Sequence, residues 1–337
     1  MDLAAQALFG LESFDFYLYR ATDRRRLECV VVRRASAQSI CMGCRDGDGG
    51  DDFGEPCASD SAFERSIVFF MCLAIFAQKV LPDWPLIVVA NRDELHARPT
   101  EAARPWVEAP SLLAGRDLQA SGTWLGLTTT GRIALLTNYR ETGMHDDRAP
   151  SRGRLAERYL QQEPSQEQSA QQYLQALQQN SEPYNGFNLL AGDQSGLWYY
   201  SNRLNAVPFK IPDGVSGVSN ATLNTPWPKL LRTQRSVSEH LAQAQAPDSA
   251  RLFEIFQDTV RAAEHELPDT GIGLDREKLL GSPFIKNERY GTRCTTIILQ
   301  HRQGYALFYE KRYDAFGQEL GDSNWQVDFL AKTIAAI

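Results

Sequence analysis

The sequence predicts a layered α+β domain that begins near residue 71. From that residue onward, short apolar runs typical of strands and amphipathic stretches typical of helices follow one another in blocks, in the order strands, helices, strands, helices, strands. This order favours sheets that are covered by helices. The chain has 337 residues, of which 43% are hydrophobic and 23% charged, so it is long enough to bury a substantial core.

Two pairs of strands open this domain. The runs at 71–78 and 85–91 are rich in strand-forming residues and are broken by Leu-Pro-Asp-Trp-Pro, which predicts two strands with a tight connection. A second pair is expected within 123–139, where Thr-Thr-Thr-Gly supplies a turn between two apolar runs. This second pair is expected to be a buried hairpin.

Helices are expected next, and their role is to cover a core. The stretches at 152–162 and 165–180 are helical in pattern, and Tyr173, Leu174 and Leu177 form one apolar stripe. The remaining expected elements are strands at 186–193, 196–202 and 214–220, helices at 226–244 and 248–266, and a closing hairpin from strands at 292–300 and 304–313.

Composition argues against two classes of partner. The formal net charge is -7, so the protein has no overall basic field to hold a nucleic acid. The longest apolar run, 67–77, is 11 residues, well short of the roughly 20 needed for a transmembrane helix. The amino terminus contains Asp2 and Glu12 and lacks the pattern of a secretory signal. A cytoplasmic location is therefore expected.

Residues 1–70 differ in kind from the rest of the chain. They contain eight arginines and no lysine, four of the six cysteines, and the run Arg-Asp-Gly-Asp-Gly-Gly-Asp-Asp at 45–52. Such a composition is typical of a loop or a disordered segment. We interpret 1–70 as a poorly ordered extension or as the product of a start codon assigned too early, and 71–337 as the functional domain.

Metal sites are not expected. Cys41 and Cys44 form a close pair, but a structural zinc site needs a second one, and Cys29 and Cys57 each stand alone. The acidic run at 45–52 departs from the calcium-loop pattern at its glycine and at its last acidic position. The five histidines show no paired spacing. No metal and no cofactor are therefore predicted.

Cys72 is the strongest candidate for chemistry, because it follows Met71 directly. Removal of a methionine at 71 would expose a cysteine that carries both a thiol and a free α-amine. An α-amine has an unperturbed pKa of about 7.7–8.0, so it can accept the proton of a thiol whose pKa is about 8.5. Such a residue needs no histidine as its base.

A reactive thiolate also needs a cation, a carboxylate and donors for an oxyanion. Arg92 and Asp93 follow the second predicted strand, in the sequence Asn-Arg-Asp-Glu, and supply a charge of each sign. Adjacent residues of a strand point to opposite faces, so a turn must intervene if both are to reach one site. The alternative is a polar turn that carries a surface ion pair.

Several motifs together resemble one protein family. They are, in chain order, MCLAIFAQ, VVANRDELHARPT, LAGRDLQASGTWLGLTTTGRIALLTNYRE, NGFNLLAGD, GVSNATLNTPWPK and YGTRCTTIIL. This combination resembles the NRDE family, also called the transport and Golgi organisation protein 2 family, from Met71 to about the carboxyl end. In that family the protein usually begins at the Met-Cys pair, and residues 1–70 have no counterpart.

The family in turn resembles the amino-terminal-nucleophile hydrolases of the choloylglycine hydrolase and penicillin V acylase group. The resemblance implies a four-layer αββα sandwich with Cys72 as the nucleophile. It implies that Arg92 and Asp93 lie beside the thiolate and the α-amine. In the hydrolases the matching arginine and aspartate are not adjacent, so Glu94 remains an alternative to Asp93.

The same resemblance implies the remaining site residues. It assigns the backbone N–H of Asn138 and the side-chain amide of Asn220 to an oxyanion hole, and Arg293 to the completion of the site. Each oxyanion donor would lower a barrier by roughly 3 kcal/mol. Trp124 and Cys294, by contrast, are expected to pack in the core.

Two functions remain open from the sequence. One is a cysteine amidohydrolase that acts on a linear amide through an acyl-thioester at Cys72. The other is a non-catalytic carrier that uses the same fold to bind haem or a lipid, because members of the family are linked to haem trafficking and lipid metabolism. The expected partner is accordingly a small-molecule amide, acyl or haem-like ligand. The sequence does not indicate an oligomeric state.

Overall fold

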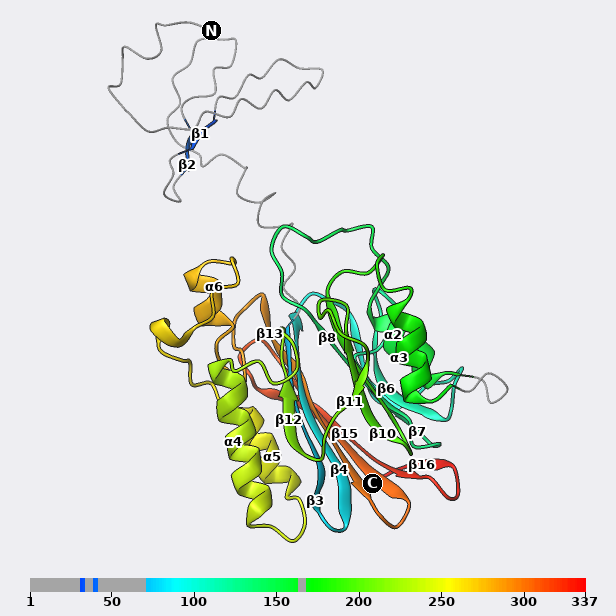
Figure 1. Cartoon of the computed structure of the whole chain (residues 1–337). Coiled ribbons are helices and arrows are strands. Elements are labelled where there is room, and N and C mark those ends of the chain that lie inside the picture. The colour runs from blue at the N-terminus through cyan, green and yellow to red at the C-terminus, as the bar shows by residue number, and fades with distance from the viewer. Residues whose placement is uncertain (1–30, 34–38, 42–70, 163–167) are drawn as a thin grey trace, which may run out of the picture. The chain divides into compact units, whose positions relative to one another are not determined.

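Figure 1 shows the computed structural model, which describes residues 31–33, 39–41, 71–162 and 168–337. The chain divides into two units, Met1–Val68 and Phe69–Ile337. In the first unit, β1 (Val31–Arg33) pairs antiparallel with β2 (Ser39–Cys41). The expectations of disorder and of a cysteine-based zinc site in this unit rest mostly on positions outside the described residues.

The second unit contains two antiparallel sheets, each of seven strands among the described residues. The first sheet, which holds the start of the domain, has the order β12-β3-β4-β13-β14-β15-β16. Its strands are β3 (Met71–Leu81), β4 (Trp84–Leu95), β12 (Gly214–Val218), β13 (Tyr290–His301), β14 (Tyr305–Tyr313), β15 (Glu319–Asp328) and β16 (Thr333–Ala336).

The second sheet has the order β11-β10-β9-β8-β7-β6-β5, so every strand pairs with its neighbour in the sequence. The β7–β8 hairpin turns at Gly131, whose φ of 80° is easily adopted only without a side chain. The strands are β5 (Thr100–Pro105), β6 (Leu112–Asp117), β7 (Leu125–Thr128), β8 (Ile133–Asn138), β9 (Phe187–Asp193), β10 (Gly196–Ser201) and β11 (Phe209–Lys210).

The two sheets pack face to face around the largest apolar core. On β3, the side chains of Ala74 and Phe76 join this core, whereas those of Leu73 and Ile75 join a second core on the other face of the sheet. This alternation follows from the two-residue period of a strand. Among the described residues, the buried members of the four apolar clusters lie within 73–327.

Helices cover the outer face of each sheet and complete four layers (Figure 1). On one side, the capping box of Ser169 and Gln172 opens a helix whose Leu174 and Leu177 are buried. On the other side, Pro228 begins the longest helix in the position that tolerates its missing N–H. The helices are α2 (Gly153–Leu160), α3 (Ala170–Gln178), α4 (Pro228–Ala242), α5 (Ser249–Phe256) and α6 (Leu274–Leu279), with a 3-10 turn η2 (Glu264–Glu266).

The predicted strand pairs and helices are confirmed among the described residues, with three corrections; residues 165–167 of the helix expected at 165–180 lie outside the described residues, and α3 begins at Ala170. The Asn-Arg-Asp-Glu motif does not follow a strand but lies inside β4, because β3 and β13 pair with it on both sides. The helix expected at 248–266 ends at Phe256, where its apolar stripe ends. The chain does not close as a hairpin, because β15 and β16 extend the sheet beyond β14. In the described part of the chain, every helix is too short or too polar to cross a membrane.

Candidate functional site

Cys72 lies in a row of three residues that crosses the first sheet. It is opposite Arg92 of β4, which is in turn opposite Cys294 of β13. Directly opposed residues of antiparallel strands project from the same face. That face is the one toward the second sheet, because Cys294 belongs to the core between the sheets and Arg92 stacks on Trp124 of the same core. Cys294 packs in the core as predicted.

Asp93 lies on the opposite face of β4 and faces the helical layer. It is in register with Thr292, whose hydroxyl donates to Oδ1 of Asp93 at 2.6 Å. On the same face, Asn91 donates to the backbone oxygens of Phe256 and Pro283. No turn intervenes between Arg92 and Asp93, so the guanidinium and the carboxylate approach the strand end of Cys72 from opposite sides of the sheet.

The Arg92 side chain is buried, and acidic groups compensate its charge. Its guanidinium lies 3.4 Å from Glu94 and 3.7 Å from Asp117, and it donates to Thr100. It also lies 4.4 Å above the centre of the Trp124 ring, at a typical cation–π distance. Trp124 therefore does more than fill the core, because it holds one face of the arginine beside Cys72.

The thiol of Cys72 is neutral at physiological pH in the continuous chain. Burial raises its pKa to about 12, and the Asp93 carboxylate acts in the same direction. The Arg92 guanidinium and the backbone N–H of Asp93 oppose this rise. Met71 precedes Cys72 in β3, so the nitrogen of Cys72 is an amide here and cannot act as a base.

The two asparagines predicted for an oxyanion hole meet next to Cys72. The Nδ2 of Asn220 donates to the backbone oxygen of Asn138 at 2.8 Å, which ties the segment after β12 to the end of β8. The neighbouring Ser219 hydroxyl donates to the backbone oxygen of Cys72 at 3.0 Å, and Thr137 of β8 donates to that of Ser219. Both asparagines are thus held at the strand end that carries the thiol.

Arg293 occupies a bulge between β4 and β13, which inserts it between Thr292 and Cys294. Its guanidinium donates to the backbone oxygens of Leu95 and Arg98, at 2.8 and 3.1 Å. Burial lowers its pKa, and the positive charge of Arg92 adds to this effect. The predicted pair of arginines therefore lies at one end of the sheet, close enough for each to influence the other.

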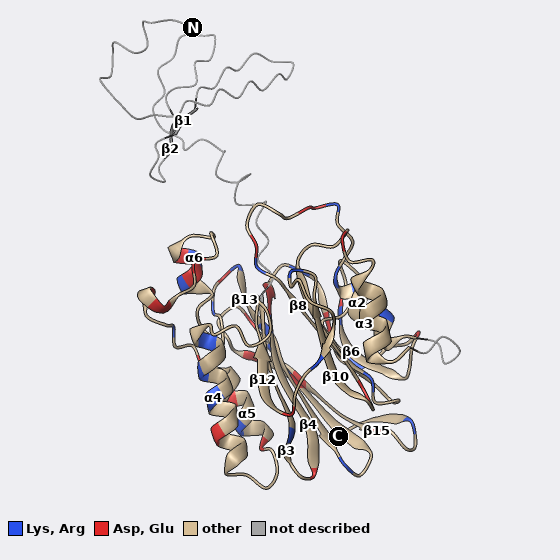
Figure 2. Ribbon diagram, viewed as in Figure 1, with Lys and Arg blue, Asp and Glu red and all other residues tan. Residues whose placement is uncertain are grey.

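Sequence reasoning missed two cations near this site, of which Lys229 is buried and Arg152 is half-buried. Burial lowers the pKa of Lys229 to about 8, against the influence of Asp93. Burial also lowers the pKa of Arg152 to about 10, while Glu141, Glu94 and the Cys72 thiol raise it. Figure 2 shows charged residues on the first turn of α4 and on α6. A lysine in the first turn of a helix is unfavourable to the helix dipole, and this unusual position is the sequence feature that could have drawn attention to Lys229.

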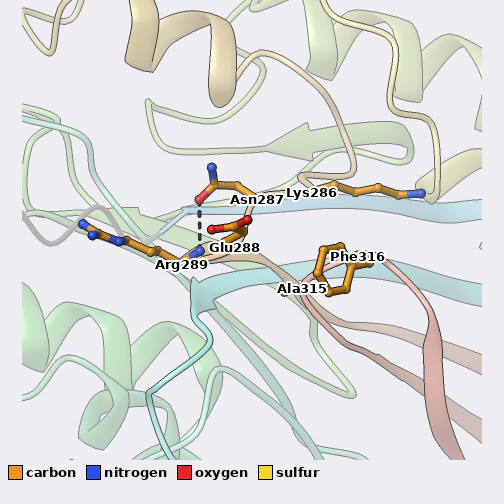
Figure 3. Close-up of a pocket in the computed structure, with 6 residues that line it drawn as sticks. All are labelled: Lys286, Asn287, Glu288, Arg289, Ala315 and Phe316. Atoms are coloured by element: carbon orange, nitrogen blue, oxygen red, sulfur yellow. Dashed lines mark hydrogen bonds between the residues drawn. The ribbon is translucent and has the colours of Figure 1, made fainter.

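The described residues offer no group of three His, Cys, Asp or Glu side chains that could hold a metal ion. The segment His145–Asp147 is an exposed loop in which His145 pairs with Asp147, and Asp146 pairs with Arg148. A surface depression lined by Lys286, Asn287, Glu288, Arg289, Ala315 and Phe316 contains none of the predicted site residues (Figure 3).

Glu94 is expected to make stability depend on pH. Burial raises its pKa to about 7, although Arg92 opposes this. The folded protein then keeps a proton that the unfolded chain releases above a pH of about 4.3, so stability should fall as pH rises from about 4 to 7 and then level off. Glu94→Gln should remove about 3–4 kcal/mol of this fall in urea-unfolding free energies.

The control for this prediction is Glu239→Gln on the exposed side of α4, which should leave the slope unchanged. Asp93, whose pKa burial raises to about 6, contributes to the slope in both variants. An identical slope in Glu94→Gln and the wild-type protein would contradict the assignment.

The fold and the site define a class: a protein of two stacked antiparallel sheets between helical layers, with a cysteine at the start of an inner strand and a buried arginine beside it. The chain belongs to the Transport and Golgi organisation 2 family, whose model matches residues 71–315. The match begins at the residue before Cys72.

Proteins from animals show the same relationship. The chain is 32% identical over 260 residues to the mouse Transport and Golgi organization 2 homolog and 33% identical over 260 residues to the human protein of that name. It is 25% identical over 270 residues to Transport and Golgi organization protein 2 of Drosophila melanogaster. Each alignment covers 72% of this chain and 92% of the relative.

Proposed function

We propose that this protein is a cysteine amidohydrolase of the amino-terminal-nucleophile type, which becomes active when the chain begins at Cys72. The observation that carries the proposal is the register at the start of β3. Cys72 is opposite Arg92, and the residue before it is opposite Asp93. A chain that starts at Cys72 would have its α-amine at that position, with a cation on one side of the sheet and a carboxylate on the other.

The proposed reaction cleaves a linear amide. The α-amine of Cys72 accepts the thiol proton, and the thiolate attacks the amide carbonyl. The oxyanion accepts hydrogen bonds from the backbone N–H of Asn138 and the side-chain amide of Asn220. The amine product leaves with the proton, and water then hydrolyses the acyl-thioester. Arg92 and Arg293 supply positive charge that favours the thiolate.

The four layers support the proposal that the domain has an amino-terminal-nucleophile-hydrolase-like fold, and the family match at 71–315 supports 71–337 as the functional domain. The hydrogen bond from Nδ2 of Asn220 to the backbone oxygen of Asn138, at 2.8 Å, holds the two residues together, which supports a role at one site. The family name concerns transport and Golgi organisation, so the carrier of haem or lipid is the alternative that the experiment must separate.

The test uses the chain that begins at Cys72 and a panel of acyl amides. We expect release of amine and a mass increase on Cys72 equal to one acyl group. Cys72→Ala should abolish both, and Cys72→Ser should slow amide cleavage. Equal turnover in wild type and Cys72→Ala would overturn the proposal. Stoichiometric binding of haem or a fatty acyl ligand without turnover, unchanged in Cys72→Ala, would favour the carrier.

A further inference from the structure

A buried pair of opposite charges lies behind Cys72, on the helical side of the first sheet. Asp93 is 1% exposed and Lys229 is 2% exposed. Among the described residues, neither Oδ2 of Asp93 nor Nζ of Lys229 has a hydrogen-bond partner. Buried charged atoms nearly always have such partners, because an unsatisfied one costs several kcal/mol. This pair therefore calls for an explanation.

The other atoms around the pair are firmly bound. Thr292 donates to Oδ1 of Asp93, which fixes the carboxylate by one oxygen only. Beside Lys229, the guanidinium of Arg140 forms an ion pair with Glu277 at 2.5 Å and stacks on Trp227. Oδ2 of Asp93 and Nζ of Lys229 therefore lack hydrogen-bond partners in a region where the neighbouring side chains form hydrogen bonds and ion pairs.

The segment that leads into Cys72 runs beside Asp93. Met71 is in register with Asp93, and the nitrogen of Cys72 is one peptide bond away from that position. When the chain begins at Cys72, the same nitrogen becomes a primary amine with additional N–H donors. An amine at this point supplies N–H donors, and Oδ2 of Asp93 is an acceptor without a donor.

We propose that Lys229 is a positioning residue for the α-amine of Cys72: the unpartnered oxygen of Asp93, whose other oxygen Thr292 holds, accepts a hydrogen bond from that amine, and the ammonium of Lys229 acts on the same amine by its charge. This inference rests on the proposed function and adds a residue to it. A nearby positive charge disfavours protonation of the α-amine and so keeps it available as a base.

The charges around Lys229 come from several elements. Asp93 of β4 has the largest favourable influence on its ammonium, followed by Cys72 of β3 and Glu277 of α6, whereas Arg140 opposes it. Burial lowers the pKa of Lys229 to about 8, and burial raises that of Asp93 to about 6. Both groups are therefore mostly ionised near pH 7, as the inference requires.

The test measures the α-amine directly and needs no substrate. A protease site introduced before Cys72 in the full chain gives the form that begins at Cys72, in which Cys72 and Cys294 are the two cysteines. With 13C-labelled cysteine, the Cα and Cβ shifts of Cys72 are followed against pH. We expect Lys229→Met to raise the apparent pKa of the α-amine by about 1 and Asp93→Asn to lower it by about 1.

Two further variants guard against misfolding. Lys229→Arg keeps the charge and should leave the titration within about 0.3 of wild type. If Lys229→Met alone does not fold, the double variant Lys229→Met/Asp93→Asn carries no buried unpaired charge, and its pKa should exceed that of Asp93→Asn by about 1. Lys79→Met, at an exposed ion pair, is the matched control.

The outcomes separate this inference from the proposed function. Shifts of opposite sign in Lys229→Met and Asp93→Asn support the inference even if no amide is cleaved. Folded variants in which Lys229 leaves the titration unchanged, or shifts it in the same direction as Asp93, overturn it while amide cleavage stands.

Discussion

Cleavage before Cys72 should accelerate alkylation of the Cys72 thiol by iodoacetamide about 100-fold at pH 7. In the continuous chain burial raises the pKa of this thiol to about 12, so almost no thiolate exists. A new α-amine provides a base and returns the thiol toward its ordinary value of about 8.5, which multiplies the thiolate fraction by more than 1,000. The lower nucleophilicity of a less basic thiolate offsets part of this gain.

The measurement compares cut and uncut protein from one preparation that carries a protease site before Cys72. Mass spectrometry of the peptide that contains Cys72 gives the labelling rate. Cys294 is the internal control, because burial raises its pKa well above the usual value in a position that the cut does not touch. Equal labelling of Cys72 before and after the cut would remove the basis of the proposed activity.

Arg92→Ala should destabilise the protein by about 3–5 kcal/mol. The substitution removes one of the two guanidinium groups beside the buried Glu94 and the half-buried Asp117, which leaves Arg98 as their remaining cation. It also removes the cation from the face of Trp124. It should also slow alkylation of Cys72 in the cut protein by about 10-fold, because a nearby cation stabilises the thiolate.

Urea unfolding and the alkylation rate check these expectations. Arg92→Lys keeps the charge but loses the forked geometry, so its effects should be intermediate. Arg104→Ala is the matched control, since its ion pair with Glu101 is largely exposed, and it should cost less than about 1 kcal/mol. If Arg92→Ala costs no more than Arg104→Ala, the arginine is not part of a compensated buried cluster.

Local patterns predicted most of the elements because the forces behind them are local. The hairpin within 123–139 follows from two apolar runs and a glycine turn, and the structure has Gly131 at φ 80° in that turn. The stripe that contains Leu174 and Leu177 faces the core as expected. Strands β15 and β16 were missed, because their exposed polar residues carry little hydrophobic periodicity.

The site was predicted less completely than the fold. Family motifs placed Cys72 and Arg92 together, and the structure has them opposite one another in neighbouring strands. Asp93 lies on the other face of the sheet. The prediction missed this because it assumed that a turn separates Asp93 from the strand. Lys229 escaped notice because its relation to Asp93 depends on how α4 packs against the sheet.

The sequence by itself determined the layered class of fold and the family, and it predicted Cys72 as the residue for covalent chemistry. These conclusions depend on hydrophobic period, turn residues and motif order, which are properties of neighbouring positions along the chain.

Only the tertiary structure decided which groups surround that cysteine. Strand register sends Arg92 and Asp93 to opposite faces, and the packing of α4 brings Lys229 to the carboxylate. Contacts between distant segments are set by sheet pairing and close packing of the whole domain, and no local pattern encodes them.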